Sequence, residues 1–153
     1  MIFKLIITFF ISFYVTNMPY IFEEEGIYQI NNLKYSYTNG YGINQDETYE
    51  IECDDSCVLT YKEYGKDDDY LININLTKKN MEKFVSILNK NHVLSWKGFH
   101  KSDNNVLDGD SFNFSLRYND DEKLSASGYM MYPNHYKDFK DKFENYVTDI
   151  KSR

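Results

Sequence analysis

Hydrophobic and polar residues alternate with a period of two along residues 112–130, as expected of strands with one buried face. The apolar positions are Phe112, Phe114, Leu116 and Tyr118 in the first run and Leu124, Ala126, Gly128 and Met130 in the second. A polar turn, Asn119-Asp120-Asp121-Glu122, separates the two runs. The pattern therefore predicts an antiparallel hairpin.

Four further runs with strand character occupy the first half of the chain. They lie at about 33–37, 47–53, 57–64 and 70–76. Many of their apolar positions are tyrosines, which suit the half-buried surface of a pleated strand. Glycine-containing polar stretches separate the first run from the second and the third from the fourth, and glycine is the residue that most readily breaks a strand. The sequence thus predicts a group of strands before the first helix.

Two helices are predicted, one over about 78–90 and one over about 134–150. In the first, Thr77 is a good N-cap and the apolar residues recur at i, i+3, i+4 and i+7. Those residues are Met81, Phe84, Val85 and Leu88. In the second, the residues gathered on one side are Tyr136, Phe139, Phe143, Tyr146, Val147 and Ile150. Each helix therefore has one face suited to packing on a sheet.

The order of these elements predicts an α+β fold. Strands grouped first, followed by helix, hairpin and helix, favour an antiparallel β-sheet of about five to six strands with two α-helices packed on one face. A chain of 153 residues, 42% of them hydrophobic, suits one core, so residues 23–153 are expected to form a single domain. The core is predicted to need Phe84, Leu88, Phe112, Leu116, Phe139 and Phe143.

Residues 1–22 have the pattern of a signal peptide or membrane anchor. Lys4 precedes an apolar run from Leu5 to Val15, and the first acidic residues arrive only at Glu23-Glu24-Glu25. No clear cleavage site follows, so both a cleaved signal and an uncleaved anchor are consistent with the pattern. The expected location is extracytoplasmic, secreted or membrane-anchored. The alternative is a cytoplasmic protein in which this run is a buried strand.

The chain has two cysteines, Cys53 and Cys57, set on either side of the turn residues Asp54-Asp55-Ser56. A three-residue turn between two strands lets the cysteines face each other, so a cross-strand disulfide is predicted. Free thiols are one alternative. A zinc site is a poorer one, because it needs about four ligands and the chain has neither a second cysteine pair nor a spaced histidine pair. No metal and no cofactor is predicted.

The net charge of −7 is unevenly distributed. Residues 23–76 carry 13 acidic residues against 3 lysines, whereas residues 77–153 carry 13 basic residues against 11 acidic ones. Nucleic acid binding needs a basic stripe, which the first half of the domain opposes. A nucleic acid partner is therefore disfavoured. The acidic residues suit a solvated face, and the alternatives are binding of cations or of a basic partner.

An ordered series of short motifs lies in the second half of the chain. It comprises Trp96-x-Gly98-Phe99-x-Lys101-Ser102-Asp103, Val106-Leu107-Asp108-Gly109, the strand start at Phe112, Ala126-Ser127-Gly128 and Tyr132-Pro133-Asn134-x-Tyr136. The series resembles a group of small uncharacterised proteins from low-GC bacteria, over roughly residues 34–150. The resemblance implies a common fold. It supplies no activity and no site residue.

Candidate chemistry is sparse. No nucleophile elbow, dinucleotide fingerprint or phosphate loop is present, and the stretch from Asp103 to Asp110 does not have the ligand spacing of a calcium loop. Trp96, Asp103 and Asp108 are weak candidates for ligand contacts, although Trp96 also suits a core position and Asp108 a turn. His100 with Asp103 or Asp108 is the one pairing that could serve a hydrolase.

These observations favour a non-enzymatic function. The expected protein is an exported or membrane-tethered small domain whose sheet face or acidic half binds another protein. The alternative is a hydrolase-like enzyme that uses His100. The two hypotheses differ in whether His100 and an aspartate meet in one pocket beside a nucleophile. The sequence leaves the partner and the oligomeric state open.

Overall fold

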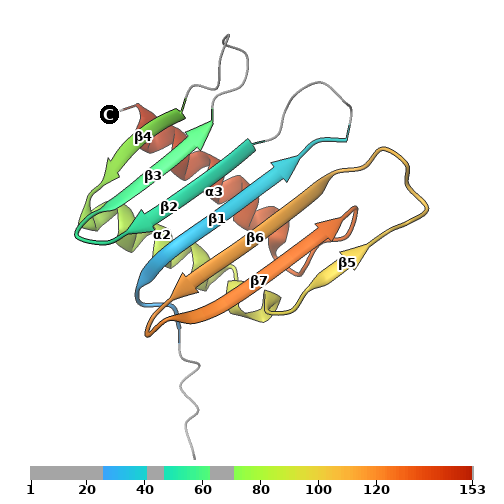
Figure 1. Cartoon of the computed structure of the whole chain (residues 1–153), viewed down its shortest axis with the longest axis horizontal. Coiled ribbons are helices and arrows are strands. Elements are labelled where there is room, and N and C mark those ends of the chain that lie inside the picture. The colour runs from blue at the N-terminus through green and yellow to red at the C-terminus, as the bar shows by residue number, and fades with distance from the viewer. Residues whose placement is uncertain (1–25, 41–46, 63–70, 153) are drawn as a thin grey trace, which may run out of the picture.

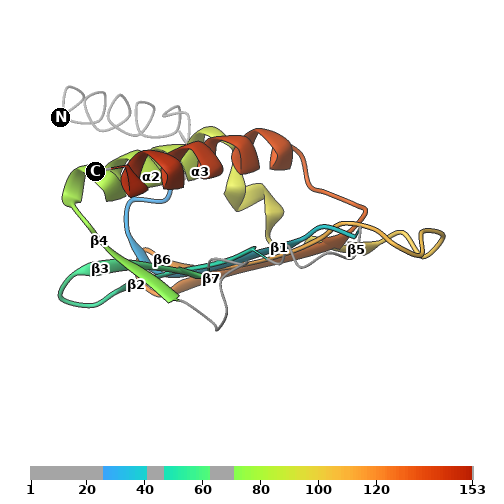
Figure 2. The same cartoon turned by 90° about the horizontal axis from the view of Figure 1, so that it is seen from above.

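The computed structural model describes residues 26–40, 47–62 and 71–152, which form one β-sheet with two helices on one of its faces (Figures 1 and 2). The strands are β1 (Ile30–Thr38), β2 (Glu47–Cys53), β3 (Cys57–Lys62), β4 (Leu71–Leu76), β5 (His100–Ser102), β6 (Ser111–Tyr118) and β7 (Glu122–Tyr129). The helices are α2 (Lys78–Lys90), the short 3-10 helix η1 (Val93–Trp96) and α3 (Tyr136–Lys151). The α+β class and the two-layer arrangement are confirmed.

The sheet is larger than expected and is mixed. Its strand order is β4-β3-β2-β1-β6-β7-β5, and every neighbouring pair is antiparallel except β5 and β7. The prediction of five to six antiparallel strands is wrong in both respects. After η1 the chain runs along the edge as β5, reverses into β6 and reverses again into β7, which inserts between them. Because β5 and β7 both run opposite to β6, they are parallel to each other.

Several predicted boundaries shift slightly. The last strand ends at Tyr129, so Met130, expected in the buried row, lies beyond it with a positive φ of 55° and is 40% exposed. The second helix begins at Tyr136 rather than 134, because His135 adopts a left-handed conformation with φ 63°. Thr77 caps α2 as predicted: its hydroxyl accepts from the Asn80 amide at 3.2 Å.

The core lies between the helices and the inner face of the sheet. All six positions predicted to form it are at most 1% exposed. Aromatic rings fill most of the space, with Phe143 of α3 in contact with Tyr35, Tyr49 and Phe84. The Tyr35 and Tyr136 hydroxyls lie 2.9 Å apart, and burial raises the pKa of both phenols, which keeps them neutral.

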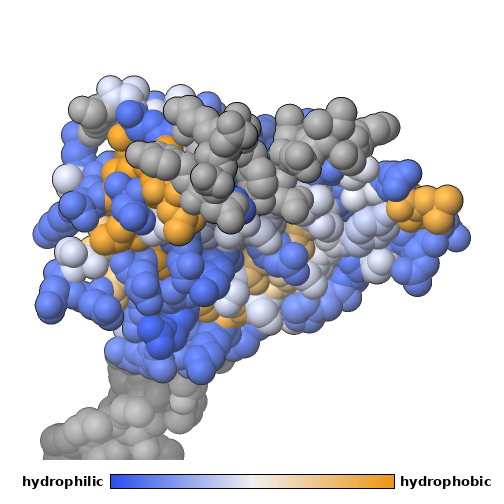
Figure 3. Space-filling view, turned by 45° about the horizontal axis from the view of Figure 1, so that its top comes forward, coloured by the Kyte–Doolittle hydropathy of each residue, from blue (hydrophilic) through white to orange (hydrophobic). Residues whose placement is uncertain are grey.

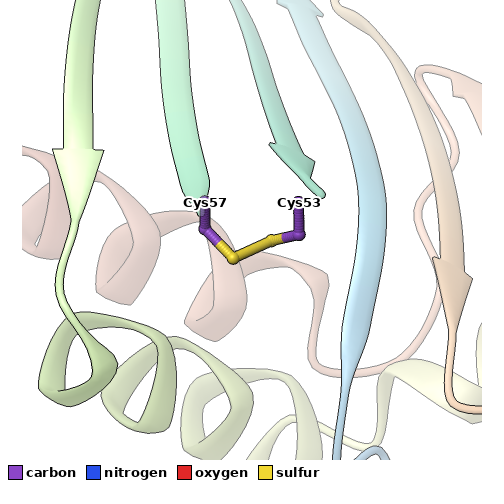
Figure 4. The surroundings of a disulfide bond; sticks show 2 residues. All are labelled: Cys53 and Cys57. Atoms are coloured by element: carbon purple, nitrogen blue, oxygen red, sulfur yellow. A yellow bond between two sulfur atoms is a disulfide. The ribbon is translucent and has the colours of Figure 1, made fainter. Parts of the chain in front are cut away.

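The β2–β3 hairpin is closed by a disulfide between Cys53 and Cys57 (Figure 4). The two residues are directly paired across the ladder, with a Cα–Cα distance of 4.1 Å. Both side chains pack against the core. The sequence-based prediction of a disulfide is confirmed, and the alternatives of free thiols and of a metal site at these cysteines fall away.

The chain enters β1 through a segment held by two asparagine side chains. Asn89 of α2 accepts from the Ile27 amide at 2.9 Å and donates to the Ile27 carbonyl at 2.7 Å. Asn119, in the β6–β7 turn, accepts from the amides of Tyr28 and Gln29 at 3.0 and 3.2 Å. The point at which residues 1–25 join the domain is therefore fixed to both the helix layer and the sheet.

The predicted signal or anchor at residues 1–22 lies outside the described part of the chain. Among the helices that are described, none is long and apolar enough to cross a membrane.

Candidate functional site

The face of the sheet that points away from α2 and α3, here called the open face, is covered by no described element (Figure 2). Strand alternation places polar side chains on it, because their neighbours in each strand turn toward the core. Its central side chains are Lys34, Ser36, Thr48, Glu50, Glu52, Asn113, Ser115, Arg117, Lys123, Ser125 and Ser127. The oblique view of Figure 3 shows hydrophilic side chains on this side of the molecule, interspersed with smaller hydrophobic areas.

Two adjoining depressions hollow the open face. The larger, about 710 Å³, lies over β2, β1, β6 and β7 and includes Glu50, Lys34, Arg117 and Lys123 among its lining residues. The smaller, about 420 Å³, extends toward His100. Lys34, Ser115 and Ser125 line both, so the two form one continuous surface. An uncovered polar face is ordinary for an antiparallel sheet, but a concave one is a feature that a partner can fill.

Charges on the larger depression are segregated by strand. The carboxylates Glu50 and Glu52 lie on β2, whereas Arg117 and Lys123 lie on β6 and β7. With Lys34 and Lys97 the lining carries four basic side chains against two acidic ones. A locally basic surface is thus embedded in a chain whose net charge is −7.

Three of the four basic side chains make ion pairs with carboxylates. Lys34 lies 2.7 Å from Glu50, directly across the β1–β2 ladder, and this hydrogen bond and the Glu50 charge raise the pKa of Lys34. Arg117 lies 3.4 Å from Asp121. Lys97 lies 3.7 Å from Glu122. All of these pairs are solvent-exposed, so they orient the cations more than they stabilise the fold.

His100 sits at the edge of the smaller depression between two serines of β7. Its Nδ1 lies 2.8 Å from the Ser127 hydroxyl, and its Nε2 lies 3.5 Å from the Ser125 hydroxyl. Among the residues that the structure describes, neither Asp103 nor Asp108 is a hydrogen-bond partner of His100. Asp103 instead accepts from the Asn105 amide at 3.0 Å in a local turn. The imidazole thus meets hydroxyl groups but not the aspartates predicted for a hydrolase.

The weak binding candidates do not converge. Trp96 is fully buried, and its indole N–H donates to the Asn134 carbonyl at 2.9 Å, so it is a core residue and not a ligand platform. Asp108 is exposed in the β5–β6 loop beside Leu107, which is 94% exposed. Asp110 has the most direct structural role of the loop carboxylates: it accepts from the Tyr37 hydroxyl at 2.8 Å and the Gly40 amide at 3.1 Å.

A third depression of about 560 Å³ lies where α3 begins, and it includes Tyr37, Asp110, Tyr132 and Lys140. Its polar groups are largely committed to one another. Besides the Tyr37–Asp110 hydrogen bond, the Lys140 ammonium lies 4.3 Å from the centre of the Tyr37 ring. Burial, with the Asp110 charge, raises the pKa of Tyr132. This arrangement fixes the β1 end against α3 and presents no activated nucleophile.

In the described segments, no group of three or more His, Cys, Asp or Glu side chains could hold a metal ion.

The structure places on the open face several residues that the sequence analysis did not single out, above all Lys34, Arg117, Lys123 and Ser127. Each occupies a polar position of a strand, and the alternation of polar and apolar residues along that strand is the only sequence signal that could have placed it on this face.

No protein-family model matches the chain, and no curated protein matches it.

Proposed function

We propose that this chain is an exported or membrane-tethered, non-enzymatic module that binds another protein on its open face. The observation that carries the proposal is the continuous depression across β2, β1, β6 and β7, lined by four basic and two acidic side chains. A partner that complements it presents an acidic segment toward Arg117 and Lys123 and a basic group toward Glu52. Electrostatic complementarity of this kind sets the register and raises the association rate of a protein complex.

The hydrolase alternative has less support. A hydroxyl nucleophile needs a base whose second nitrogen is held by an orienting group, commonly a carboxylate. Both nitrogens of His100 face serine hydroxyls, on an exposed part of the sheet. The surroundings of the ring are those of a polar surface on which a partner can form hydrogen bonds.

Photo-crosslinking in the producing cells tests the binding surface. A benzophenone amino acid replacing Ser115, which lines both depressions, is expected to give a discrete adduct with a partner protein. The same amino acid replacing Asn145, exposed on α3, is expected to give none. Reversing two charges, with Arg117→Glu and Lys123→Glu, should lower the Ser115 adduct by at least about tenfold, since close interfacial charges couple by more than about 1.5 kcal/mol.

A matched control carries Lys79→Glu and Lys137→Glu, two exposed lysines on the helix layer. It changes the net charge by the same amount and should leave the adduct unchanged. An adduct that forms at Asn145 instead of Ser115, or one that is equally abundant in both charge-reversed proteins, means that the open face is not the binding surface.

The extracytoplasmic location is proposed on the disulfide together with the signal-like N-terminus. Disulfides persist in oxidising compartments and are rare in the cytosol. Protein taken from its natural compartment, denatured without reduction and treated with a maleimide, should therefore incorporate no label at Cys53 or Cys57. Reduction beforehand should allow both to react. Complete labelling without reduction would place the folded protein in a reducing compartment.

A further inference from the structure

The sheet ends at an edge strand that lacks the usual protection. β4 pairs with β3 on one side and, among the described elements, with nothing on the other (Figure 1). Its sequence, Leu-Ile-Asn-Ile-Asn-Leu, contains no charge and no proline. Natural sheets commonly protect edges with lysine, proline or very short strands, and the opposite edge, β5, is short and contains Lys101. An unprotected edge of this length is a surface for pairing with another strand.

The disulfide shows which backbone groups of β4 point outward. The Cα–Cα distance of 4.1 Å between Cys53 and Cys57 is that of a non-hydrogen-bonded pair, as close approach requires. Cys57 therefore turns its N–H and C=O away from β2, toward its β4 partner Leu76. Cys57 and Leu76 therefore form a hydrogen-bonded pair between β3 and β4.

Starting from Leu76, the backbone N–H and C=O groups of successive β4 residues point alternately toward β3 and away from it. Leu76, Ile74 and Ile72 direct their N–H and C=O toward β3, so Asn75 and Asn73 direct theirs outward from the sheet. The side chains alternate as well. Ile72 and Ile74 pack against the core on the helix side, whereas Asn73 and Asn75 are exposed on the open face.

We propose that β4 pairs antiparallel with β4 of a second copy of this chain, with Ile74 on the two-fold axis. In this register Asn73 of one copy and Asn75 of the other exchange backbone hydrogen bonds through their outward groups. Ile74 faces Ile74, and Ile72 faces Leu76, so the helix-side row is apolar throughout. On the open face the asparagine amides lie side by side. Cross-strand pairs of like chemistry stabilise such a ladder.

Other registers match less well. A shift of one residue would turn apolar side chains onto the open face. A shift of two in one direction would place Leu71, which is 58% exposed, against Asn75. A shift of two in the other direction would leave only residues 74–76 of each β4 strand paired. Hydrophobic side chains reach the surface at the end of the molecule where β4 lies (Figure 3), and the proposed pairing covers part of them.

In the proposed dimer the two open faces lie on the same side of one continuous sheet. If each open face binds a partner as proposed above, the dimer is bivalent.

Sedimentation velocity of the full chain tests the pairing. The wild-type protein should be dimeric at about 100 µM and dissociate on dilution, by mass action. Asn73→Pro should be monomeric throughout, because proline at an outward-facing edge position removes the intermolecular donor and no backbone hydrogen bond to β3. It also removes the exposed side-chain hydrogen bond that Asn73 accepts from the Thr60 hydroxyl of β3 at 2.7 Å. Asn73→Ala loses the same side-chain bond but keeps the backbone donor, so it should still dimerise. The circular dichroism and the melting temperature of the two variants, measured on dilute protein, should match, which shows that the proline keeps the fold.

A pair of cysteine variants tests the register. The native cysteines are bonded to each other, so an introduced cysteine is the one free thiol of the chain. Under mild oxidation Ile74→Cys should form a covalent dimer, since it meets its own copy in a non-hydrogen-bonded pair. Ile72→Cys should do so at least about tenfold more slowly. In the proposed register, residue 72 of one copy lies opposite Leu76 of the other copy, so the two introduced thiols are not close to each other. A wild-type monomer at about 100 µM, a dimer that survives Asn73→Pro, or equal cross-linking of the two variants would overturn the proposal.

Discussion

Replacing Phe143 by alanine is expected to lower the free energy of unfolding by about 3–5 kcal/mol, the range for deletion of a buried phenylalanine. Phe143 is fully buried on α3, and its ring contacts aromatic side chains from both layers. The centroid distances are 5.4 Å to Tyr35, 5.0 Å to Tyr49 and 5.6 Å to Phe84. Alanine removes all three contacts and leaves a cavity between the sheet and both helices, which the stiff β1 and β2 strands cannot close.

Urea unfolding followed by tryptophan fluorescence measures this change, since Trp96 lies in the same core. Asp141→Ala, two residues earlier on the exposed side of α3, is the control and should change stability by less than about 0.5 kcal/mol. A loss below that level for Phe143→Ala would mean that α3 does not pack on the sheet through this face.

The fold was predictable in the elements whose apolar residues recur with a clear period, two residues in a strand or about 3.6 in a helix. Strand alternation located Phe112, Phe114 and Leu116 on one face, and all three are buried in β6. Helical spacing did the same for Phe139 and Phe143. In these elements burial on one side is the main source of stability, so the hydrophobic pattern specifies both the element and its orientation.

β5 was missed because its three residues carry no such pattern. His100, Lys101 and Ser102 are all exposed, and the strand forms because its backbone finds the edge of β7. The parallel direction follows from the insertion of β7 between β5 and β6, which is a property of the topology. No local propensity in three residues encodes it.

The sequence predicted that the open face is polar, but not where its charges lie. Arg117 and Lys123 lie directly opposite each other in the β6–β7 ladder, and Lys34 lies opposite Glu50 in the β1–β2 ladder. The concentration of charge therefore arises from cross-strand register across four strands. Sequence separation conceals it: His100 and Ser127 meet although they are far apart along the chain.

The motif series of the second half has a structural explanation. Trp96 donates to the Asn134 carbonyl, and the Gly98 amide donates to the Ser125 carbonyl at 3.1 Å. The Ser127 amide in turn donates to the Phe99 carbonyl at 2.8 Å. These contacts join the segment after α2, strand β7 and the turn before α3 into one unit. The motif residues build the β5 edge, and the proposed binding surface lies beside them.

Gly128→Ala should accordingly be among the most damaging small substitutions, with a loss of about 3 kcal/mol, the upper part of the range for overpacking. An added Cβ would lie 1.9 Å from the Met131 carbonyl oxygen and 2.6 Å from Phe112 Cε1. Neither neighbour can withdraw easily, because the first is backbone and the second belongs to a ring that is 1% exposed. Thermal and urea unfolding of the variant measure the loss.

Gly98→Ala separates this steric effect from backbone strain. Gly98 has φ 76°, a left-handed conformation that disfavours alanine, but an added Cβ there meets no atom within 4 Å. Its loss should be about 1–2 kcal/mol, the energy of placing one L-residue in that region. Gly128 has no such φ, so its larger loss must come from steric overlap with Met131 and Phe112. If Gly98→Ala proved the more damaging of the two, the segment before α3 would not cross β7 at Gly128, and the joined unit described above would be wrong.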